Sequence, residues 1–189
     1  MNIIIRPMRP EDVPAAKHVM LTVAAGIFDP DHPAVTFINR HTSPLADVDD
    51  FRTQYGPPNG LFLVVVDEDE IIGTGAIRRI DDVTAELRRM WLLPIYHGQG
   101  IGYRLAQGLF DFARAAGYQT VRLSTSALQT QAIRFYKRLG FYSIPRYRDT
   151  DDEVFMEIRL GPAEVVESTA DHRPPTTGDS CRPTTGDSC

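Results

Sequence analysis

The chain has 189 residues, of which 42% are hydrophobic and 24% are charged, so it can bury the core of one globular domain with residues to spare. Its net charge of -5 lacks the basic excess that attracts a polyanion, which excludes nucleic acid as the expected partner. No apolar run is long enough to span a bilayer, and Arg6 follows the start too closely for a secretory signal, so we expect a cytoplasmic protein without a membrane partner.

The C-terminal part of the chain, residues 161–189, differs from the rest in composition. It contains RPPTTGDSC followed by RPTTGDSC, a tandem repeat that offers little to bury, so we predict a disordered tail. A peptide ligand or a redox-active cysteine pair is the functional alternative for this repeat. Because both cysteines, Cys181 and Cys189, lie in the tail, the domain at 1–160 has no thiol nucleophile and no cysteine-based zinc site.

The first third of the domain predicts a strand, a helix and an irregular segment. Residues 2–6 are β-rich, and Pro10-Glu11-Asp12 opens a stretch whose apolar residues recur at helical spacing. These apolar residues are Val13, Ala16, Val19, Met20 and Val23. The segment 26–60 is irregular around a short helix expected at 45–55, and such loops often carry specificity.

Acidic residues gather in this irregular segment. Asp29, Asp31 and His32 lie in a proline-interrupted loop. No further metal-ligating residue follows at a spacing typical of a metal site, so we expect none here. The acids would favour a cationic amine at the mouth of a nearby site, although acidic loops are usually only solvated. The further acids are Asp47, Asp49 and Asp50.

Three strands are predicted next. The apolar runs 61–66 and 71–77 flank a polar turn, which is typical of an antiparallel pair, and residues 84–93 form a third strand. Because side chains alternate along a strand, the third strand is predicted to have two distinct faces. One face holds Glu86, Arg88, Met90 and Leu92, and the other holds Leu87, Arg89, Trp91 and Leu93.

The second half of the domain alternates helices and strands. After a loop at 94–100, a helix ends at Gly117, a strand covers 120–124, a second helix ends at Gly140 and a last strand covers 153–160. The apolar stripes of the two helices are Ile101, Leu105, Leu109, Phe112 and Ala116, and then Leu128, Ala132, Phe135 and Leu139. The order βα(α)βββαβαβ predicts a mixed α/β domain whose sheet is covered by helices.

The most informative segment is the glycine-rich stretch YHGQGIG at 96–102, between the third strand and the following helix. Unpaired backbone N–H groups in front of a helix N-terminus attract an anion, and glycines let a phosphate approach the backbone. The segment lacks the Gly-Lys-Ser/Thr of a P-loop, and Tyr103 stands where a dinucleotide fingerprint needs glycine. A tight turn whose glycines only satisfy backbone geometry is the alternative.

Three segments in combination resemble the GNAT acetyltransferases: ELRRMWLLP at 86–94, HGQGIG at 97–102 and AIRFYKRLGF at 132–141. The likeness in element order covers roughly residues 1–160. It implies the GNAT fold, a central mixed and mostly antiparallel sheet flanked by helices. It also implies transfer of the acetyl group of acetyl-CoA, a co-substrate, to a primary amine of a small molecule or peptide N-terminus. Many relatives are dimers, so a homodimer is a further expectation.

The resemblance also implies which residues contact the co-substrate. Amides of the glycine-rich loop would hold the CoA pyrophosphate, and the end of the third strand would pair with the pantetheine arm, leaving an N–H near Leu92 for the oxyanion. His97 replaces the usual Gln or Arg, so we expect weaker or pH-sensitive pyrophosphate binding. Gln129 matches a cofactor-contacting position, or forms a capping box with Ser126. The loop positions are His97, Gly98, Gln99, Gly100, Ile101 and Gly102, and the strand positions are Met90, Trp91, Leu92 and Leu93. Packing in the core is a compatible role for Met90 and Leu92, because the contact with the co-substrate uses the backbone.

Acetyl transfer also needs a base and an acid, because at neutral pH only about one primary amine in two thousand is unprotonated. Glu86 matches the family's position for the base, and an ion pair with Arg78 or Arg88 is its alternative role. Tyr136 matches the tyrosine whose hydroxyl points at the departing sulfur, or else it anchors that hydroxyl on a backbone group.

Two other functions fit the same sequence. A catalytically idle module of this fold could bind CoA or an amine as a sensor. A different donor such as succinyl-CoA would also fit, because a phosphate-binding loop does not contact the acyl group. No serine lies in a Gly-x-Ser-x-Gly elbow, so a hydrolase of that kind is not indicated.

Overall fold

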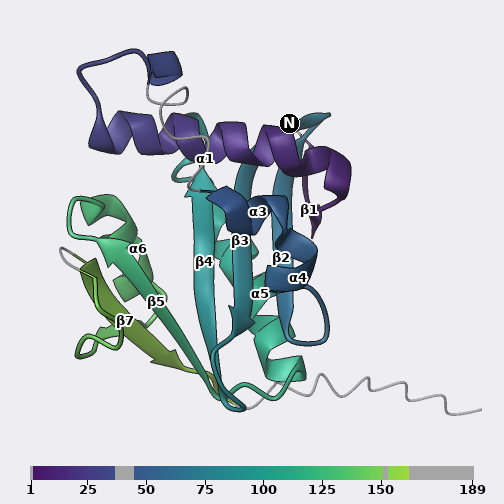
Figure 1. Cartoon of the computed structure of the whole chain (residues 1–189), viewed down its shortest axis with the longest axis vertical. Coiled ribbons are helices and arrows are strands. Elements are labelled where there is room, and N and C mark those ends of the chain that lie inside the picture. The colour runs from purple at the N-terminus through teal and green to yellow at the C-terminus, as the bar shows by residue number, and fades with distance from the viewer. Residues whose placement is uncertain (1, 37–44, 151–152, 162–189) are drawn as a thin grey trace, which may run out of the picture.

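A seven-stranded sheet forms the centre of the computed structural model, which describes residues 2–36, 45–150 and 153–161. The strands lie in the order β1-β2-β3-β4-β5-β7-β6, and all neighbours are antiparallel except β4 and β5, which run parallel. The expected mixed, mostly antiparallel sheet is therefore confirmed (Figure 1). The strands are β1 (Ile3–Pro7), β2 (Gly60–Asp67), β3 (Glu70–Arg79), β4 (Thr84–Leu92), β5 (Thr120–Ser126), β6 (Tyr142–Ser143) and β7 (Glu153–Arg159), of which the short β6 was not expected.

Helices cover both faces of the sheet (Figure 1). The helix α1 and the short helices α3 and α4 pack on one face, and α5 and α6 pack on the other. No helix within the described ranges is long and apolar enough to cross a bilayer. The helices are α1 (Val13–Phe28), α3 (Ala46–Asp49), α4 (Phe51–Tyr55), α5 (Ile101–Ala115) and α6 (Thr130–Arg138), with 3-10 turns at Pro10–Asp12 and Pro94–Tyr96. Except for Gly161, the predicted tail lies outside the described residues.

The alternation of side chains divides the hydrophobic residues between two cores. In β2, Leu63 and Val65 pack in the core that contains α5, whereas Phe62 and Val64 pack in the core that contains α1. Successive side chains of a strand point to opposite faces, so one apolar strand can supply both cores. We call these two sides of the sheet the α5 face and the α1 face.

A β-bulge interrupts this alternation in β4. Arg88 pairs with Ala76 and Trp91 pairs with Thr74, so two residues of β4, Arg89 and Met90, lie opposite the single residue between them on β3. Arg89 has a positive φ of 53°, and its carbonyl accepts a hydrogen bond from the Thr74 hydroxyl at 2.7 Å. A bulge inserts one residue into the ladder, so the side chains beyond it change faces.

The bulge makes one prediction of the sequence analysis wrong. Glu86, Met90 and Leu92 were expected on the same face of the strand. In the structure, Met90 and Leu92 pack with Leu87 in the core of the α5 face, and Trp91 packs in the core of the α1 face. Glu86 therefore points to the face opposite Met90 and Leu92, because it lies before the inserted residue.

The strands β4 and β5 separate soon after they meet. Their pairing extends only from Thr84 to Glu86 on β4 and from Thr120 to Arg122 on β5. Beyond this point the two strands diverge toward α1 (Figure 1). Within the described residues, the outer edge of β4 has no strand partner after Glu86, so its backbone groups there are free of sheet pairing.

Candidate active site

A cavity of about 640 Å³ lies between the end of β4, the segment that follows β5, and the helices α1, α5 and α6. Its walls come from both sides of the sheet: Trp91 and the last turns of α1 on the α1 face, and Met90, Leu105 and Tyr136 on the α5 face. The cavity therefore borders both faces of the sheet. It is lined by Val23, Gly26, Ile27, Met90, Trp91, Leu92, Tyr96, His97, Gly98, Gly100, Ile101, Gly102, Tyr103, Leu105, Leu128, Gln129, Thr130, Gln131, Ala132, Phe135, Tyr136, Arg138 and Leu139.

The glycine-rich loop forms one end of this cavity, directly before α5. Gly98 and Gly100 have φ values of 77° and 76°, a left-handed conformation that glycine adopts without steric cost. Within the described residues, no backbone carbonyl accepts from the N–H groups of Gly98, Gln99 and Gly100. These donors and the first N–H groups of α5 lie together at the N-terminal end of the helix, where the helix dipole gives a positive potential. The loop can therefore bind a phosphate group.

His97 uses both ring nitrogens in contacts within the protein. Its Nε2 lies 2.9 Å from the Leu92 carbonyl oxygen, and its Nδ1 lies 3.1 Å from the amide nitrogen of Gln131. These partners assign the proton to Nε2, with Nδ1 accepting from the amide. The side chain therefore joins the loop to β4 and α6, whereas the sequence analysis expected it to contact a pyrophosphate.

The other expected co-substrate residues divide into two groups. Leu93 and Gln99 do not line the cavity: the Leu93 N–H donates to the Ile72 carbonyl at 3.0 Å, and the Gln99 amide donates to the Ile95 carbonyl at 3.1 Å. Because backbone N–H groups alternate in direction along a strand, Leu92 presents its N–H to the unpaired edge of β4. The remaining expected positions all line the cavity.

Gln129 does not form the expected capping box. The helix α6 begins at Thr130, so Gln129 is the residue before the helix, and its side chain makes no capping hydrogen bond. Its Oε1 accepts from the Thr125 hydroxyl at 2.6 Å, and Ser126 instead accepts from the Leu128 N–H at 3.3 Å. Leu128, expected in the buried stripe of this helix, lies before the helix and is 67% exposed.

Tyr136 lies at the centre of the cavity wall. Its ring packs edge-on against Phe141 at 5.7 Å between ring centroids, and the residue is 7% exposed. Burial raises the pKa of Tyr136 well above its ordinary value, so the hydroxyl stays protonated at physiological pH. Within the described residues, this hydroxyl has no hydrogen-bond partner, so the expected backbone anchor is not present.

Glu86 lies among cationic side chains on the α1 face. It is 3% exposed, and its Oε2 accepts from Nε and Nη2 of Arg78 at 3.0 and 2.9 Å and lies 3.4 Å from Arg88. Its Oε1 lies 3.2 Å from Nη2 of Arg148 and 3.3 Å from the hydroxyl of Tyr147. The carboxylate is thus surrounded by donors, and both arginines named for its alternative role contact it.

Two of the acids expected at the mouth of the site form ion pairs with residues outside it. Asp47 binds Arg89 through both oxygens, and Asp49 lies 2.8 Å from the ammonium group of Lys17. No aspartate or glutamate lines the cavity among the residues that the structure describes. The expected preference for a cationic acceptor therefore has no support in this site.

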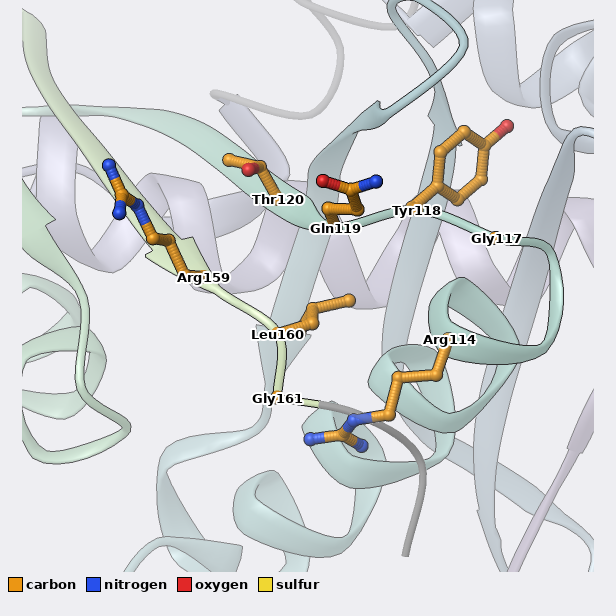
Figure 2. Close-up of a pocket in the computed structure, with 8 residues that line it drawn as sticks. All are labelled: Arg114, Gly117, Tyr118, Gln119, Thr120, Arg159, Leu160 and Gly161. Atoms are coloured by element: carbon orange, nitrogen blue, oxygen red, sulfur yellow. The ribbon is translucent and has the colours of Figure 1, made fainter.

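Figure 2 shows a second cavity, of about 590 Å³, at the other end of α5. Arg114 from the last turn of α5 and Arg159 at the end of β7 lie on its walls, with Leu160 between them in this view. A helix of 15 residues is roughly 22 Å long. This cavity is therefore distant from the glycine-rich loop and from Tyr136, and it does not belong to the same site.

The sequence analysis missed the contribution of α1 to the first cavity. Val23, Gly26 and Ile27 continue the helical spacing of the predicted stripe, so the signal for a common face was present. It also missed Tyr147 and Arg148, which lie 61 and 62 residues from Glu86 in the chain. No local pattern indicates such a contact.

A cavity that ends at a helix N-terminus with free backbone amides is an arrangement that can hold an anionic co-substrate. The family model for the acetyltransferase (GNAT) family matches residues 27–141, which is more than half of the chain. The chain therefore belongs to the GNAT acetyltransferase family and is an acyl-CoA-dependent N-acyltransferase.

Known proteins show how far the likeness extends. The chain is 28% identical over 160 residues to the uncharacterized N-acetyltransferase YjgM of Escherichia coli, covering 83% of this chain and 92% of that protein. It is 33% identical over 120 residues to the N-acetylaspartate synthetase of Danio rerio, covering 62% of this chain but 42% of that longer relative. Its fold matches the PaiA N-acetyltransferase of Thermoplasma acidophilum in complex with coenzyme A, with a TM-score of 0.69, 21% identity and coverage of 84% and 99% of the two chains.

Proposed function

We propose that this protein transfers the acetyl group of acetyl-CoA to a primary amine of a small molecule, by direct attack in a ternary complex. The cavity between the end of β4 and the segment that follows β5 carries this proposal. It joins the anion-binding loop of α5 to the α1 face of the sheet. Donor and acceptor can thus approach from opposite faces and be bound at the same time, which brings the reacting atoms together without a covalent enzyme intermediate.

The loop residues fit the phosphate end of the co-substrate. The free N–H groups at Gly98, Gln99 and Gly100 supply donors, and the α5 dipole favours negative charge at the same place. At the other end of the cavity, the N–H of Leu92 faces the unpaired edge of β4. A backbone N–H in this position would stabilise the oxyanion that develops on the thioester carbonyl. The PaiA N-acetyltransferase, a protein of the same fold, was crystallised in complex with coenzyme A, which supports coenzyme A as the carrier of the acyl group.

Tyr136 has the properties of the group that assists the leaving sulfur. As the amine nitrogen bonds to the carbonyl carbon, the carbon–sulfur bond breaks and the sulfur leaves as a thiolate, whose parent thiol has a pKa of about 8.5. The raised pKa of Tyr136 keeps its hydroxyl available as a donor, and that hydroxyl has no competing partner within the described residues. The amine nitrogen loses one proton as the amide forms, and the CoA thiolate gains one proton to become the thiol.

The contacts of Glu86 favour the ion-pair role among its two expected roles. A general base needs a free lone pair directed at the amine or at a bridging water. Both oxygens of Glu86 already lie close to donors from Arg78, Arg148 and Tyr147. We therefore propose that Glu86 holds the arginines in place and that the acceptor binds as the free amine.

Initial-rate kinetics test the proposed function. Thiol release from acetyl-CoA is followed with purified protein and a panel of amines, amino acids, polyamines and aminoglycosides. We expect at least one acceptor to give saturable release, with intersecting double-reciprocal plots that mark a ternary complex. Binding of acetyl-CoA without release for any acceptor would favour the sensor function, and faster release from succinyl-CoA would reassign the donor.

A further inference from the structure

Among the described residues, the arginines around Glu86 have more hydrogen-bond donors than acceptors to satisfy them. Each guanidinium group carries five N–H donors, yet the contact that Arg88 makes with a described side chain is a single long one, 3.4 Å from Glu86. The Nε of Arg148 is buried and has no hydrogen-bond partner within the described residues. The side chains of Arg88 and Arg148 are 25% and 31% exposed, compared with 4% for Glu86. A ligand can therefore reach the arginines while the carboxylate beneath them stays covered.

The same group of side chains carries excess positive charge. We define the arginine cluster as Arg78, Arg88, Arg122 and Arg148. Three carboxylates contact these residues: Glu86; Glu157, 2.8 Å from Arg122; and Glu153, 3.8 Å from Arg148. Four guanidinium groups against three carboxylates leave one positive charge among these described residues. These guanidinium groups are a quarter to a third exposed, so their excess positive charge can attract a ligand with one negative charge.

The arginine cluster lies where β4 and β5 begin to separate. Glu86 is the last residue of β4 that pairs with β5, and Arg122 is its partner. Arg148 contacts both strands, through Glu86 on β4 and through the hydroxyl of Ser124 on β5. None of the four arginines lines the cavity itself, and the cluster lies where the unpaired edge of β4 begins.

The cluster also lies on the acceptor side of the sheet. Arg88 precedes the bulge and pairs with Ala76, which belongs to the core of the α1 face. Trp91 packs in the same core and lines the cavity. Arg88 lies on the same face as Trp91, and the bulge directs Met90 to the opposite face. An acceptor bound at the cluster would therefore extend along the α1 face toward Trp91 to reach the cavity.

We infer that the acceptor is an amine that also carries a carboxylate, and that the arginine cluster binds this carboxylate through Arg88 and Arg148. The inference rests on the proposed function. The planar fork of a guanidinium group matches the two oxygens of a carboxylate. An amino acid whose amine has lost its proton is a monoanion, so its charge equals the excess of the cluster. Anchoring this group fixes the amine relative to the thioester.

Matched acceptor pairs test this inference. The pairs are glycine and glycinamide, β-alanine and its amide, 4-aminobutyrate and butylamine, and L-glutamate and L-glutamine. Rates are expressed per concentration of unprotonated amine, because amides and acids differ in amine pKa. We expect kcat/KM to favour the member with the additional carboxylate at least tenfold in one or more pairs. Equal values within every pair would overturn the inference and leave acetyl transfer itself established.

Variants localise the effect to the cluster. We expect Arg88→Gln to lower the ratio of kcat/KM for the acid to kcat/KM for its matched partner at least tenfold, without changing the KM of acetyl-CoA. Arg88→Lys should restore part of this ratio. Arg114→Gln, at the far end of α5 in a pair with Asp111, serves as the control and should leave the preference intact. If Arg88→Gln lowered kcat/KM for the acid and for the amide by the same factor, Arg88 would not bind the carboxylate of the acceptor.

A binding measurement separates this inference from the proposed function. Calorimetry compares N-acetylglycine with N-acetylglycinamide, and the corresponding products of the other pairs, in the presence of CoA. Tighter binding of the acids without any turnover would support the anion site and reject acetyl transfer. Equal binding of acids and amides would reject the anion site whatever the turnover.

Discussion

Asp47 and Arg89 form a two-point ion pair that joins α3 to the bulge of β4. The Nε of Arg89 lies 2.9 Å from Oδ2 of Asp47, its Nη2 lies 2.5 Å from Oδ1, and the Tyr55 hydroxyl donates to the same carboxylate. Burial alone would raise the pKa of Asp47, but the hydrogen bonds from Arg89 and Tyr55 outweigh it and hold the pKa below its ordinary value. The pair thus holds Arg89 in the conformation that the bulge requires.

Replacing Asp47 by asparagine should destabilise the fold and the site together. We expect Asp47→Asn to lower the free energy of unfolding by about 2 kcal/mol, because Arg89 loses a charged partner in a largely buried place. The lowered folded-state pKa means that this stabilisation is present above about pH 4 and is lost as the pH falls through that pKa. Urea unfolding at pH 7 and pH 3.5 should therefore show a smaller difference at the lower pH.

The control for this prediction is Asp49→Asn. Asp49 pairs with Lys17 but is 56% exposed, so its loss should change stability by less than about 0.5 kcal/mol. If both variants unfolded like the unsubstituted protein, the pair of Asp47 and Arg89 would not stabilise the bulge.

Gly100 and Gly117 provide a matched pair of substitutions at the two ends of α5. Their φ values are 76° and 88°, and an added Cβ would meet no atom within 4 Å at either position. Alanine should therefore cost a similar amount at both, about 1 kcal/mol from the left-handed backbone. Only Gly100→Ala should also raise the Kd of acetyl-CoA, by about tenfold, because only Gly100 lies in the anion-binding loop. Thermal unfolding and calorimetric titration measure the two effects, and equal weakening by Gly117→Ala would remove the loop from the binding site.

Tyr136→Phe should separate chemistry from binding. The ring packing is retained while the donor is lost, so we expect kcat to fall by about 10²-fold with little change in the KM of acetyl-CoA. Tyr118→Phe is the control, since Tyr118 is also buried but its hydroxyl donates to the Asn59 carbonyl at 2.9 Å outside the site. That variant should lose about 1 kcal/mol of stability and keep its kcat. Unchanged turnover in Tyr136→Phe would assign the proton transfer to another group.

Glu86→Gln distinguishes the two roles of this residue. Without its charge, the partly buried guanidinium groups of Arg78, Arg88 and Arg148 repel one another, so we expect a clear fall in melting temperature. We also expect kcat to stay within about tenfold, with an unchanged pH profile. A fall of 10² to 10⁴ that recovers at alkaline pH, where the acceptor amine is unprotonated, would instead make Glu86 the general base.

Local sequence patterns were sufficient for most of the elements and for the co-substrate end of the site. Apolar periodicity predicted the long helices and strands because it reflects which face of an element must be buried. The glycines of the loop predicted an anion-binding turn, because left-handed backbone conformations and exposed amides are local properties. Tyr136 was placed in the same site only through the resemblance to the GNAT family, because no local pattern connects it to the loop.

Only the tertiary structure decided the face on which each side chain of β4 lies and the surroundings of Glu86. The bulge at Arg89 depends on β3 pairing two residues against one, which the alternating pattern of β4 alone does not encode. The arginine cluster comes from β3, β4, β5 and the segment before β7. Ion pairs between residues this far apart in the chain follow from strand order and chain packing, so no local pattern specifies them.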